Sequence, residues 1–203
     1  MRCTAPTLSY KIQFTFKLYI KYVTIQTMSN YKRYFSQLKN PVFITVVTKN
    51  RQQILIDNIE LLKDCLKNSM HKFNYKFIAG IIMPDHFHIL IYSEKPDLIP
   101  KIIHDIKYSF SKNITSNVQL TESEQKRGDK GIWQRRYYDH IIRDENDLNR
   151  HLDYIHYNSM KHLNIEPKNW KCSSFHKFVK NSYYEEDWCN FNDRNDINNL
   201  ELE

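Results

Sequence analysis

The chain has 203 residues, of which 41% are hydrophobic and 26% charged, so general disorder is excluded and one domain with extensions is expected. Its 30 Lys and Arg residues outnumber 23 Asp and Glu, and the resulting formal charge of +7 favours a polyanionic partner. The four cysteines are scattered and form no C-x-x-C pair, which indicates reduced thiols in a cytoplasmic protein rather than a disulfide framework.

The N-terminal region differs in character from the rest of the chain. Residues 10–25 are apolar but are interrupted by three lysines. A membrane span needs about 20 nearly uncharged residues, and a signal peptide needs a cleaner apolar core, so neither is expected. Met28 opens a second potential start. We therefore expect residues 1–27 to be an extension outside the domain, 28–188 to form the domain, and 189–203 to be a polar, frayed tail.

The first half of the domain alternates strand and helix patterns. Residues 42–48 are β-branched and aromatic, which predicts a strand. Apolar residues recur every three or four positions from Asp57 to Phe73 and predict an amphipathic helix. Two further strands are predicted at 75–82 and 86–92, and the short connection between them makes them antiparallel.

The second half continues with a helix, a loop, a strand and a long helix. An apolar face runs through 99–114, whereas 117–131 are polar and predict a loop. A fourth strand is predicted at 137–143. Asp144 is a good N-cap for a helix that reaches about His162, and the tail that follows is expected to pack irregularly.

The order of these elements predicts the fold class. It is β-α-β-β-α-β followed by one helix, which is the ferredoxin-like split βαβ arrangement of the α+β class. The sheet is expected to be antiparallel, with its third strand near the centre. We expect a single domain of this kind with an added C-terminal helix.

Two histidines stand one residue apart in the third predicted strand, within MPDHFHIL. Side chains alternate along a strand, so His86 and His88 share a face and Phe87 points to the other. Two imidazoles are poor core filling but a good pair of metal ligands. Taken alone, His-x-His on a strand is more often a packing or surface feature than a metal site.

A tyrosine and an asparagine share one face of the last long helix. Tyr154 and Asn158 are four residues apart and therefore about one helical turn from each other. With His86 and His88, the amide oxygen of Asn158 would suit Mg²⁺ or Mn²⁺, and Tyr154 is the candidate nucleophile. Taken alone, Tyr154 would be a core or rim aromatic and Asn158 a helix-end residue.

Basic and aromatic residues interleave in GIWQRRYYDHIIRD. Arginine pairs with phosphates, and aromatic rings stack on unpaired bases, which favours single-stranded or hairpin DNA. The candidate DNA-binding residues are Trp133, Arg135, Arg136, Tyr138, His140 and Lys161. Simple surface solvation is an equal alternative for Arg135 and Arg136. For His140, a structural role is favoured over contact with DNA or metal.

The chain resembles a known family through four motifs in order: MPDHFHIL, GIWQRRYYDHIIRD, HLDYIHYNSMKH and WKCSSFH. Between about Met28 and Trp188 it is similar to the REP-associated tyrosine transposases, which are single-tyrosine HUH transposases. The resemblance implies that His86, His88 and Asn158 bind a divalent metal, Mg²⁺ or Mn²⁺, and that Tyr154 is the nucleophile.

The same resemblance implies an activity and a partner. Single-stranded DNA would be cut next to a hairpin formed by palindromic repeats, leaving a 5′-phosphotyrosine and a free 3′-hydroxyl. One departure is Ser159, because the family usually has proline after the asparagine. The implied protein is a monomer or homodimer that is cytoplasmic, makes no membrane contact and joins the nucleoid when bound to DNA.

The closest rival among enzymes is a replication initiator or relaxase of the wider HUH class, although these proteins are usually larger. Two functions without catalysis also remain open from the sequence. One is a domesticated, non-catalytic protein that binds hairpin DNA, although the intact set of His86, His88, Tyr154 and Asn158 argues against it. The other is a ferredoxin-like RNA-binding module with aromatic stacking residues on its sheet. The chain lacks the glycine-aromatic signature of that module, which would also leave the histidine pair without a role.

Overall fold

The computed structural model describes residues 40–114 and 118–189. The expected extension 1–27, the proposed start at Met28 and the tail from residue 190 lie outside these residues. The described chain forms two compact units. The sheet unit comprises 40–78 and 82–140, and the C-terminal unit comprises 79–81 and 141–189. Within the described ranges, every helix is too short or too polar to traverse a bilayer.

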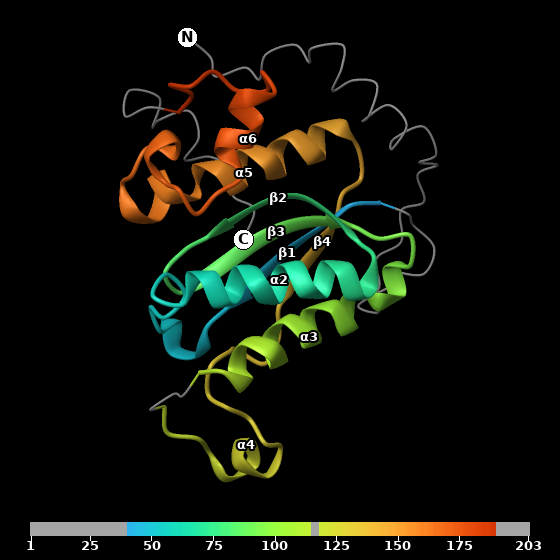
Figure 1. Cartoon of the computed structure of the whole chain (residues 1–203), viewed down its shortest axis with the longest axis vertical. Helices are drawn as coiled ribbons and strands as arrows, with labels where there is room; N and C mark the ends of the chain where they lie inside the picture. Colours follow the sequence, from blue (N-terminus) through green and yellow to red (C-terminus); the bar gives the residue numbers. More distant parts are fainter. Residues whose placement is uncertain (1–39, 115–117, 190–203) are drawn as a thin grey trace. The chain divides into compact units, whose positions relative to one another are not determined.

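Four strands form one sheet. They are β1 (Val42–Val47), β2 (Lys76–Ile82), β3 (His86–Tyr92) and β4 (Tyr138–Ile141). Their order across the sheet is β2-β3-β1-β4 (Figure 1), and β1 runs antiparallel to β3, from Val42 opposite Ile91 to Val47 opposite His86. This is the strand order of the split βαβ fold, so the predicted ferredoxin-like class with a central third strand is confirmed.

The helices lie between and after these strands in the chain, except that β2 and β3 follow each other directly. They are α2 (Ile59–Phe73), α3 (Ile99–Lys112), α4 (Glu122–Lys126), α5 (Glu145–Leu163) and α6 (Phe175–Lys180), with 3₁₀ turns η1 (Lys49–Arg51), η2 (Pro96–Leu98) and η3 (Pro167–Asn169). The predicted N-cap of α5 is confirmed, because the side chain of Asp144 accepts a hydrogen bond from the Asp147 amide at 2.8 Å. Asn164 ends α5 in the left-handed conformation.

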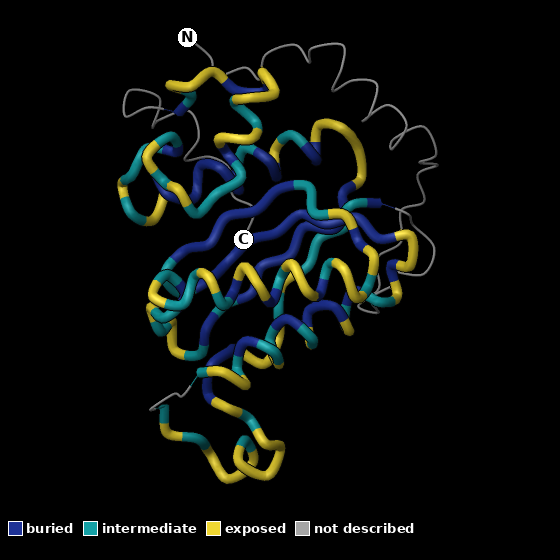
Figure 2. Tube along the Cα trace, in the orientation of Figure 1, coloured by how far each residue is buried: buried dark blue, intermediate teal, exposed yellow. Residues whose placement is uncertain are grey.

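The core of the sheet unit lies between the sheet and the helices α2 and α3, which run side by side along one face (Figure 1). The apolar stripe of α3 includes Ile102, Ile106 and Phe110, all with no exposed surface. Phe87 of β3 meets the ring of Trp133 at 5.9 Å between centroids, so this face of β3 turns toward the helices. In Figure 2 the strands β1 and β3 are buried along most of their length, whereas β4 is partly exposed and one side of α2 is exposed to solvent.

Two regions differ from the prediction. The expected loop 117–131 contains α4, whose N-terminus is a capping box between Thr121 and Glu124. The expected irregular tail contains α6. The tail also joins the sheet through a bridge between Ser173 and Ile81. Both helices have at most six residues, too few for a repeating apolar stripe to predict them.

Cys189 is the one residue of the expected tail 189–203 that the structure describes. Cys189 is fully buried and packs with Tyr157 and Met160 of α5, with Trp188 against the same cluster. Burial of this apolar cluster anchors the end of the described chain to α5.

Candidate functional site

The two histidines lie side by side on one face of β3, as strand alternation predicts. Their ring centroids are 4.9 Å apart and the rings are inclined by 75°. Both residues are buried, with exposed fractions of 3% for His86 and 0% for His88. The opposite face of β3 packs on Trp133, so the pair lies on the sheet face that α2 and α3 do not cover.

Each imidazole is held by a hydrogen bond at the same ring nitrogen. Nδ1 of His86 lies 2.6 Å from Oδ1 of Asp85, and Nδ1 of His88 lies 2.8 Å from Oγ1 of Thr45. Because Nδ1 is engaged in both rings, Nε2 is the atom that each ring offers to a metal ion. This is the usual arrangement of metal-binding histidines, in which an outer partner fixes the orientation of the ring.

The carboxyl group of Asp85, which contacts His86, is favoured in its ionised form. Burial raises the pKa of its carboxyl, but the hydrogen bond with His86 and the charges of His86 and Arg51 outweigh burial and lower the pKa below its ordinary value. Arg51 approaches the second carboxylate oxygen at 3.3 Å. Asp85 stands directly before the histidine pair in the chain, and its carboxylate contacts the imidazole of His86.

Thr45 was missed in the sequence, where it stands within an ordinary β-branched strand. It faces His88 directly across the β1–β3 pair, and Phe43 two residues earlier stacks on the same imidazole at 5.3 Å. Cross-strand neighbours share a sheet face, so the register places both residues beside the pair. Only knowledge of this register could have identified them.

Tyr154 and Asn158 lie on the buried side of α5, with exposed fractions of 1% and 0%. The side-chain amide of Asn158 donates from Nδ2 to the backbone oxygen of Tyr154 at 3.4 Å. This bond directs the NH₂ group to the helix backbone, so the amide oxygen is the end that can serve as a ligand. Nζ of Lys161 lies 4.9 Å from the centre of the Tyr154 ring, which places a positive charge beside the phenol.

A buried polar network supports α5 next to Tyr154. Tyr184 donates to Asp153 at 2.8 Å and contacts Nδ1 of His156 at 3.2 Å, while Nε2 of His156 meets the hydroxyl of Ser174 at 2.8 Å. The Gly80 amide of β2 donates to that hydroxyl at 3.0 Å. The sequence gave no partner for His156 and did not identify this network.

The network is satisfied when Asp153 is ionised and His156 is neutral. Burial lowers the pKa of His156 to about 3. Burial also raises the pKa of Asp153 to about 6, although the hydrogen bond from Tyr184 opposes this rise. Neutral His156 can then donate from Nδ1 to Tyr184 and accept at Nε2 from Ser174. In these protonation states, each hydrogen bond of the network, from the Gly80 amide through Ser174, His156 and Tyr184 to Asp153, has one donor and one acceptor.

The predicted DNA-binding residues divide into core and surface positions. Trp133 is 6% exposed, and its indole nitrogen donates to the backbone oxygen of Lys107 at 3.1 Å, which argues against base stacking on its ring. Arg135 and Arg136 are exposed, and His140 is half-buried on β4. Tyr138 is 45% exposed on β4, which lies at the edge of the sheet.

An aromatic row links that sheet edge to the histidine pair. The ring of Tyr138 meets Phe43 edge-on at 6.3 Å, and Phe43 in turn stacks on His88 at 5.3 Å. The exposed end of the row therefore lies on the same sheet face as the pair. Lys161, the last predicted DNA contact, is exposed on α5.

Comparisons with known proteins agree on one family. The family described as "Transposase IS200 like" matches residues 35–158. A Haemophilus influenzae protein named as a REP-associated tyrosine transposase is 38% identical over 165 residues, covering 79% of this chain and 93% of that protein. The REP-associated tyrosine transposase of Escherichia coli K12 is 28% identical over 163 residues, covering 79% of this chain and 91% of that protein.

A solved structure extends the similarity to three dimensions. It is a REP-associated tyrosine transposase bound to a REP hairpin, and it matches with a TM-score of 0.65 and 27% sequence identity. The match covers 79% of this chain and 91% of the other. The shared fold and the shared sequence thus point to the same group of proteins.

Proposed function

The chain belongs to the IS200-like transposase family, as a REP-associated tyrosine transposase, and on this premise we propose that it cuts and rejoins single-stranded DNA beside hairpins. Membership of a transposase family makes it a nucleic-acid-cleaving enzyme.

The observation that carries the proposal is the anchored histidine pair. Two buried imidazoles side by side, each held through Nδ1, fit a divalent cation bound through both Nε2 atoms. The amide oxygen of Asn158 is the proposed third ligand, and Mg²⁺ or Mn²⁺ is the expected ion. Such an ion, when bound, would polarise the scissile phosphate and stabilise the charge that develops during attack.

Tyr154 is the proposed nucleophile. Its phenolic oxygen attacks the phosphorus, so that a tyrosine oxygen–phosphorus bond forms while the bond to the 3′ oxygen breaks. The phenol loses one proton and the departing 3′ oxygen gains one, which leaves a 5′-phosphotyrosine and a 3′-hydroxyl. Lys161 lies beside the ring and can stabilise the phosphate that becomes attached there. The reverse reaction rejoins a strand without an external energy source.

The proposed substrate is a DNA hairpin with an adjoining single strand. The solved relative was bound to a REP hairpin, and the charge of +7 favours DNA. Tyr138 offers an exposed ring at the end of the aromatic row that reaches the histidine pair, and the exposed Arg135 and Arg136 shortly before it in the sequence offer guanidinium groups for phosphates. Palindromic repeats are the expected source of such hairpins.

The test is trapping of the covalent product. Labelled hairpin strands are incubated with the protein and Mn²⁺, and a protein-linked band is sought on a denaturing gel. Tyr154→Phe should lose the band and keep hairpin binding, whereas Tyr157→Phe, a neighbouring buried tyrosine of the same helix, should retain both. His86→Ala and His88→Ala should lose cleavage even in excess Mn²⁺. A normal yield of adduct from Tyr154→Phe would overturn the assignment.

A further inference from the structure

Attack by the Tyr154 phenol on phosphorus requires a group that accepts the phenolic proton. A phenol in water has a pKa of about 10, so a nearby base assists its ionisation at neutral pH. Histidine is the side chain that most often acts as such a base. The helix α5, which carries Tyr154, also carries three histidines, His151, His156 and His162.

Most of the histidines near the proposed site already have another role. In the pair on β3, both ring nitrogens are assigned, Nδ1 to an orienting hydrogen bond and Nε2 to the proposed metal ion. Both nitrogens of His156 are engaged in the buried network of the tail. His162 is exposed and lies eight residues from Tyr154, which is more than two helical turns. Among the histidines of α5, His151 remains.

His151 and Tyr154 lie on one face of α5. They are three residues apart, and side chains at this spacing are neighbours on a helix, with about 5–6 Å between Cβ atoms. Both residues are buried, each with an exposed fraction of 1%. Helical side chains lean toward the N-terminus of their helix, so the Tyr154 side chain leans toward the turn that carries His151.

A backbone contact fixes the tautomer of His151. Nδ1 of the ring lies 2.7 Å from the backbone oxygen of Asp147, and a carbonyl oxygen can only accept a hydrogen bond. Nδ1 therefore carries the hydrogen, and in the neutral ring Nε2 has the lone pair that takes up a proton. This is the form of histidine that a general base requires.

The side chain of Asp147 supports the same ring nitrogen. Its Oδ1 lies 3.3 Å from Nδ1 of His151, and the residue is only 5% exposed. When Nε2 takes up a proton the ring becomes a cation, and a carboxylate beside Nδ1 stabilises that charge. Arg143 donates to Oδ2 of Asp147 from its backbone amide at 2.9 Å and from Nε at 3.1 Å, which holds the carboxylate in place.

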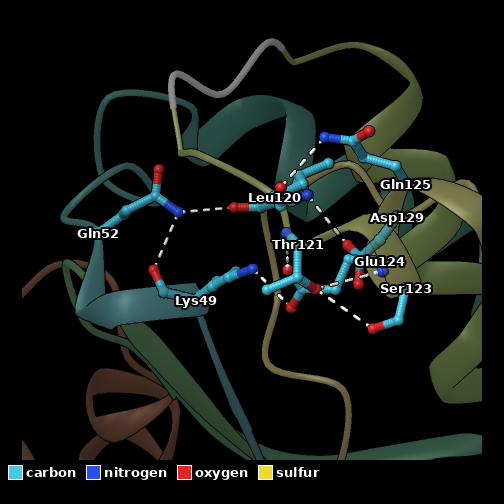
Figure 3. A network of polar contacts seen from close by, with 9 residues as sticks. Lys49, Gln52, Leu120, Thr121, Ser123, Glu124, Gln125 and Asp129 are labelled. Atoms are coloured by element: carbon cyan, nitrogen blue, oxygen red, sulfur yellow. Dashed lines mark hydrogen bonds and ion pairs between the residues drawn. The ribbon is translucent and has the colours of Figure 1, made fainter.

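The carboxylate beside α4 is arranged differently (Figure 3). Glu124 there completes the capping box with Thr121 and forms an ion pair with Lys49 at 2.7 Å. The hydrogen bond with Lys49 is the main cause that lowers the pKa of Glu124 to about 2, so this pair stays charged and serves to hold the loop. The pair of Asp147 and His151 instead contains an imidazole, the side chain suited to exchanging protons near neutral pH.

We propose that His151 is the general base for Tyr154 and that Asp147 is its positioning residue. As the phenolic oxygen bonds to phosphorus, its O–H bond breaks and the proton passes to Nε2 of His151. The bond from phosphorus to the 3′ oxygen breaks with its electron pair on that oxygen, which takes a proton from solvent. In rejoining, His151 returns a proton to the phenol. The inference rests on the proposed function and names the residue that moves its proton.

The experiment measures single-turnover formation of the protein–DNA adduct at saturating Mn²⁺ and hairpin DNA. His151→Gln keeps a polar side chain but removes the base, so the rate should fall by about 100-fold or more while hairpin affinity is unchanged. His162→Gln, at an exposed histidine of the same helix, is the matched control and should keep the wild-type rate. Asp147→Asn should show a smaller loss, because Asp147 acts through His151.

Fluorinated tyrosines at position 154 separate proton transfer from damage to the fold. Fluorine lowers the pKa of a phenol with little change in its size, and a phenol that is already ionised needs no base. The rate deficits of His151→Gln and Asp147→Asn should therefore shrink stepwise from tyrosine through mono-, di- and trifluorotyrosine. A deficit caused by misfolding would stay constant along this series.

Two results would overturn the assignment of the base and leave the proposed function intact. One is a wild-type rate for His151→Gln with the ordinary Tyr154, and the other is a deficit that stays constant along the fluorotyrosine series. Absence of any adduct from the wild-type protein would overturn the proposed function and the base together.

Discussion

The hydroxyl of Tyr184 donates a 2.8 Å hydrogen bond to the carboxylate of Asp153, the residue that precedes Tyr154 on α5. The two residues are 31 positions apart, and Tyr184 follows α6 in the tail. Through Ser174 the same network reaches Gly80 of β2. Within the C-terminal unit, the tail therefore connects the helix of the proposed nucleophile to Gly80. Tyr184 and Ser174 lie beyond residues 35–158, which the family match covers.

The first prediction concerns Tyr184→Phe. The substitution leaves the buried carboxylate of Asp153 without this donor, so the free energy of unfolding at pH 7.5 should fall by about 1.5–3 kcal/mol. The loss should be smaller at pH 5, because Asp153 is largely protonated there. Its pKa is about 6 in the wild type, and removing the Tyr184 donor raises this pKa further. Urea unfolding at the two pH values measures the difference.

Tyr183→Phe is the matched control for that experiment. The Tyr183 hydroxyl donates at 2.8 Å to the neutral amide oxygen of Asn149 on the same helix. Its removal should lower the free energy of unfolding by about 0.5–1.5 kcal/mol, by a similar amount at both pH values. An equal pH dependence for the two variants would contradict an ionised Asp153 in the network.

The second prediction concerns the pH dependence produced by Asp153. Burial raises the pKa of Asp153 to about 6 in the folded state, above the ordinary value of 3.8 expected after unfolding. The wild-type protein is therefore most stable, with respect to this group, below about pH 4, where Asp153 is protonated in both the folded and the unfolded state. As the pH rises through 6, the free energy of unfolding falls, and the total loss at pH 7 is up to about 3 kcal/mol. Asp153→Asn removes this penalty.

The difference in the free energy of unfolding between Asp153→Asn and the wild type should consequently change in favour of the variant as the pH rises from 4 to 7. The low pKa of His156, about 3 because of burial, gives stability that is present above pH 6.5 and is lost on acidification. This opposing effect occurs in both proteins and cancels in their difference. Unfolding free energies measured across that range should diverge as the pH rises, and a constant difference would show that Asp153 has an ordinary pKa.

The fold was largely predictable because its pattern is local. Alternation and helical periodicity identified all four strands, and they placed α5 at 144–162, against Glu145–Leu163 in the structure. The fourth strand is shorter than expected, Tyr138–Ile141 instead of 137–143. The short helix α4 was missed despite Thr121 and Glu124 standing at the spacing of a capping box, since its residues show no apolar stripe.

The candidate site was only half predictable. A two-residue spacing on a strand is sufficient to place His86 beside His88, and a four-residue spacing on a helix places Tyr154 near Asn158. The residues that orient these groups come from distant segments: Thr45 is 43 positions from His88. Such contacts depend on strand register and on the docking of the tail, which single-sequence periodicity does not encode.

The third prediction concerns the partner of His88. Thr45→Val keeps the shape of the side chain but removes the hydroxyl that holds Nδ1 at 2.8 Å. The imidazole loses its fixed orientation, so the Mn²⁺ concentration needed for half-maximal cleavage should rise by about 10-fold or more. Thr45→Ser retains the hydroxyl and should restore the wild-type metal dependence. Affinity for hairpin DNA without metal should be the same in all three proteins, and a parallel loss of that affinity would indicate general damage to the fold.

The last prediction concerns the positive charge beside Tyr154. Lys161→Met removes an ammonium group that lies 4.9 Å from the ring centre, and the phosphate gained in the adduct then lacks this counter-charge. The rate of adduct formation should fall by about 10-fold, which corresponds to roughly 1.4 kcal/mol of lost stabilisation. Lys168→Met, on η3 in the same unit, changes the net charge equally but removes a lysine paired with Glu166 at 3.3 Å. Single-turnover kinetics at saturating DNA should therefore be slowed by Lys161→Met alone, and an equal slowing by both variants would reduce the role of Lys161 to general electrostatic attraction.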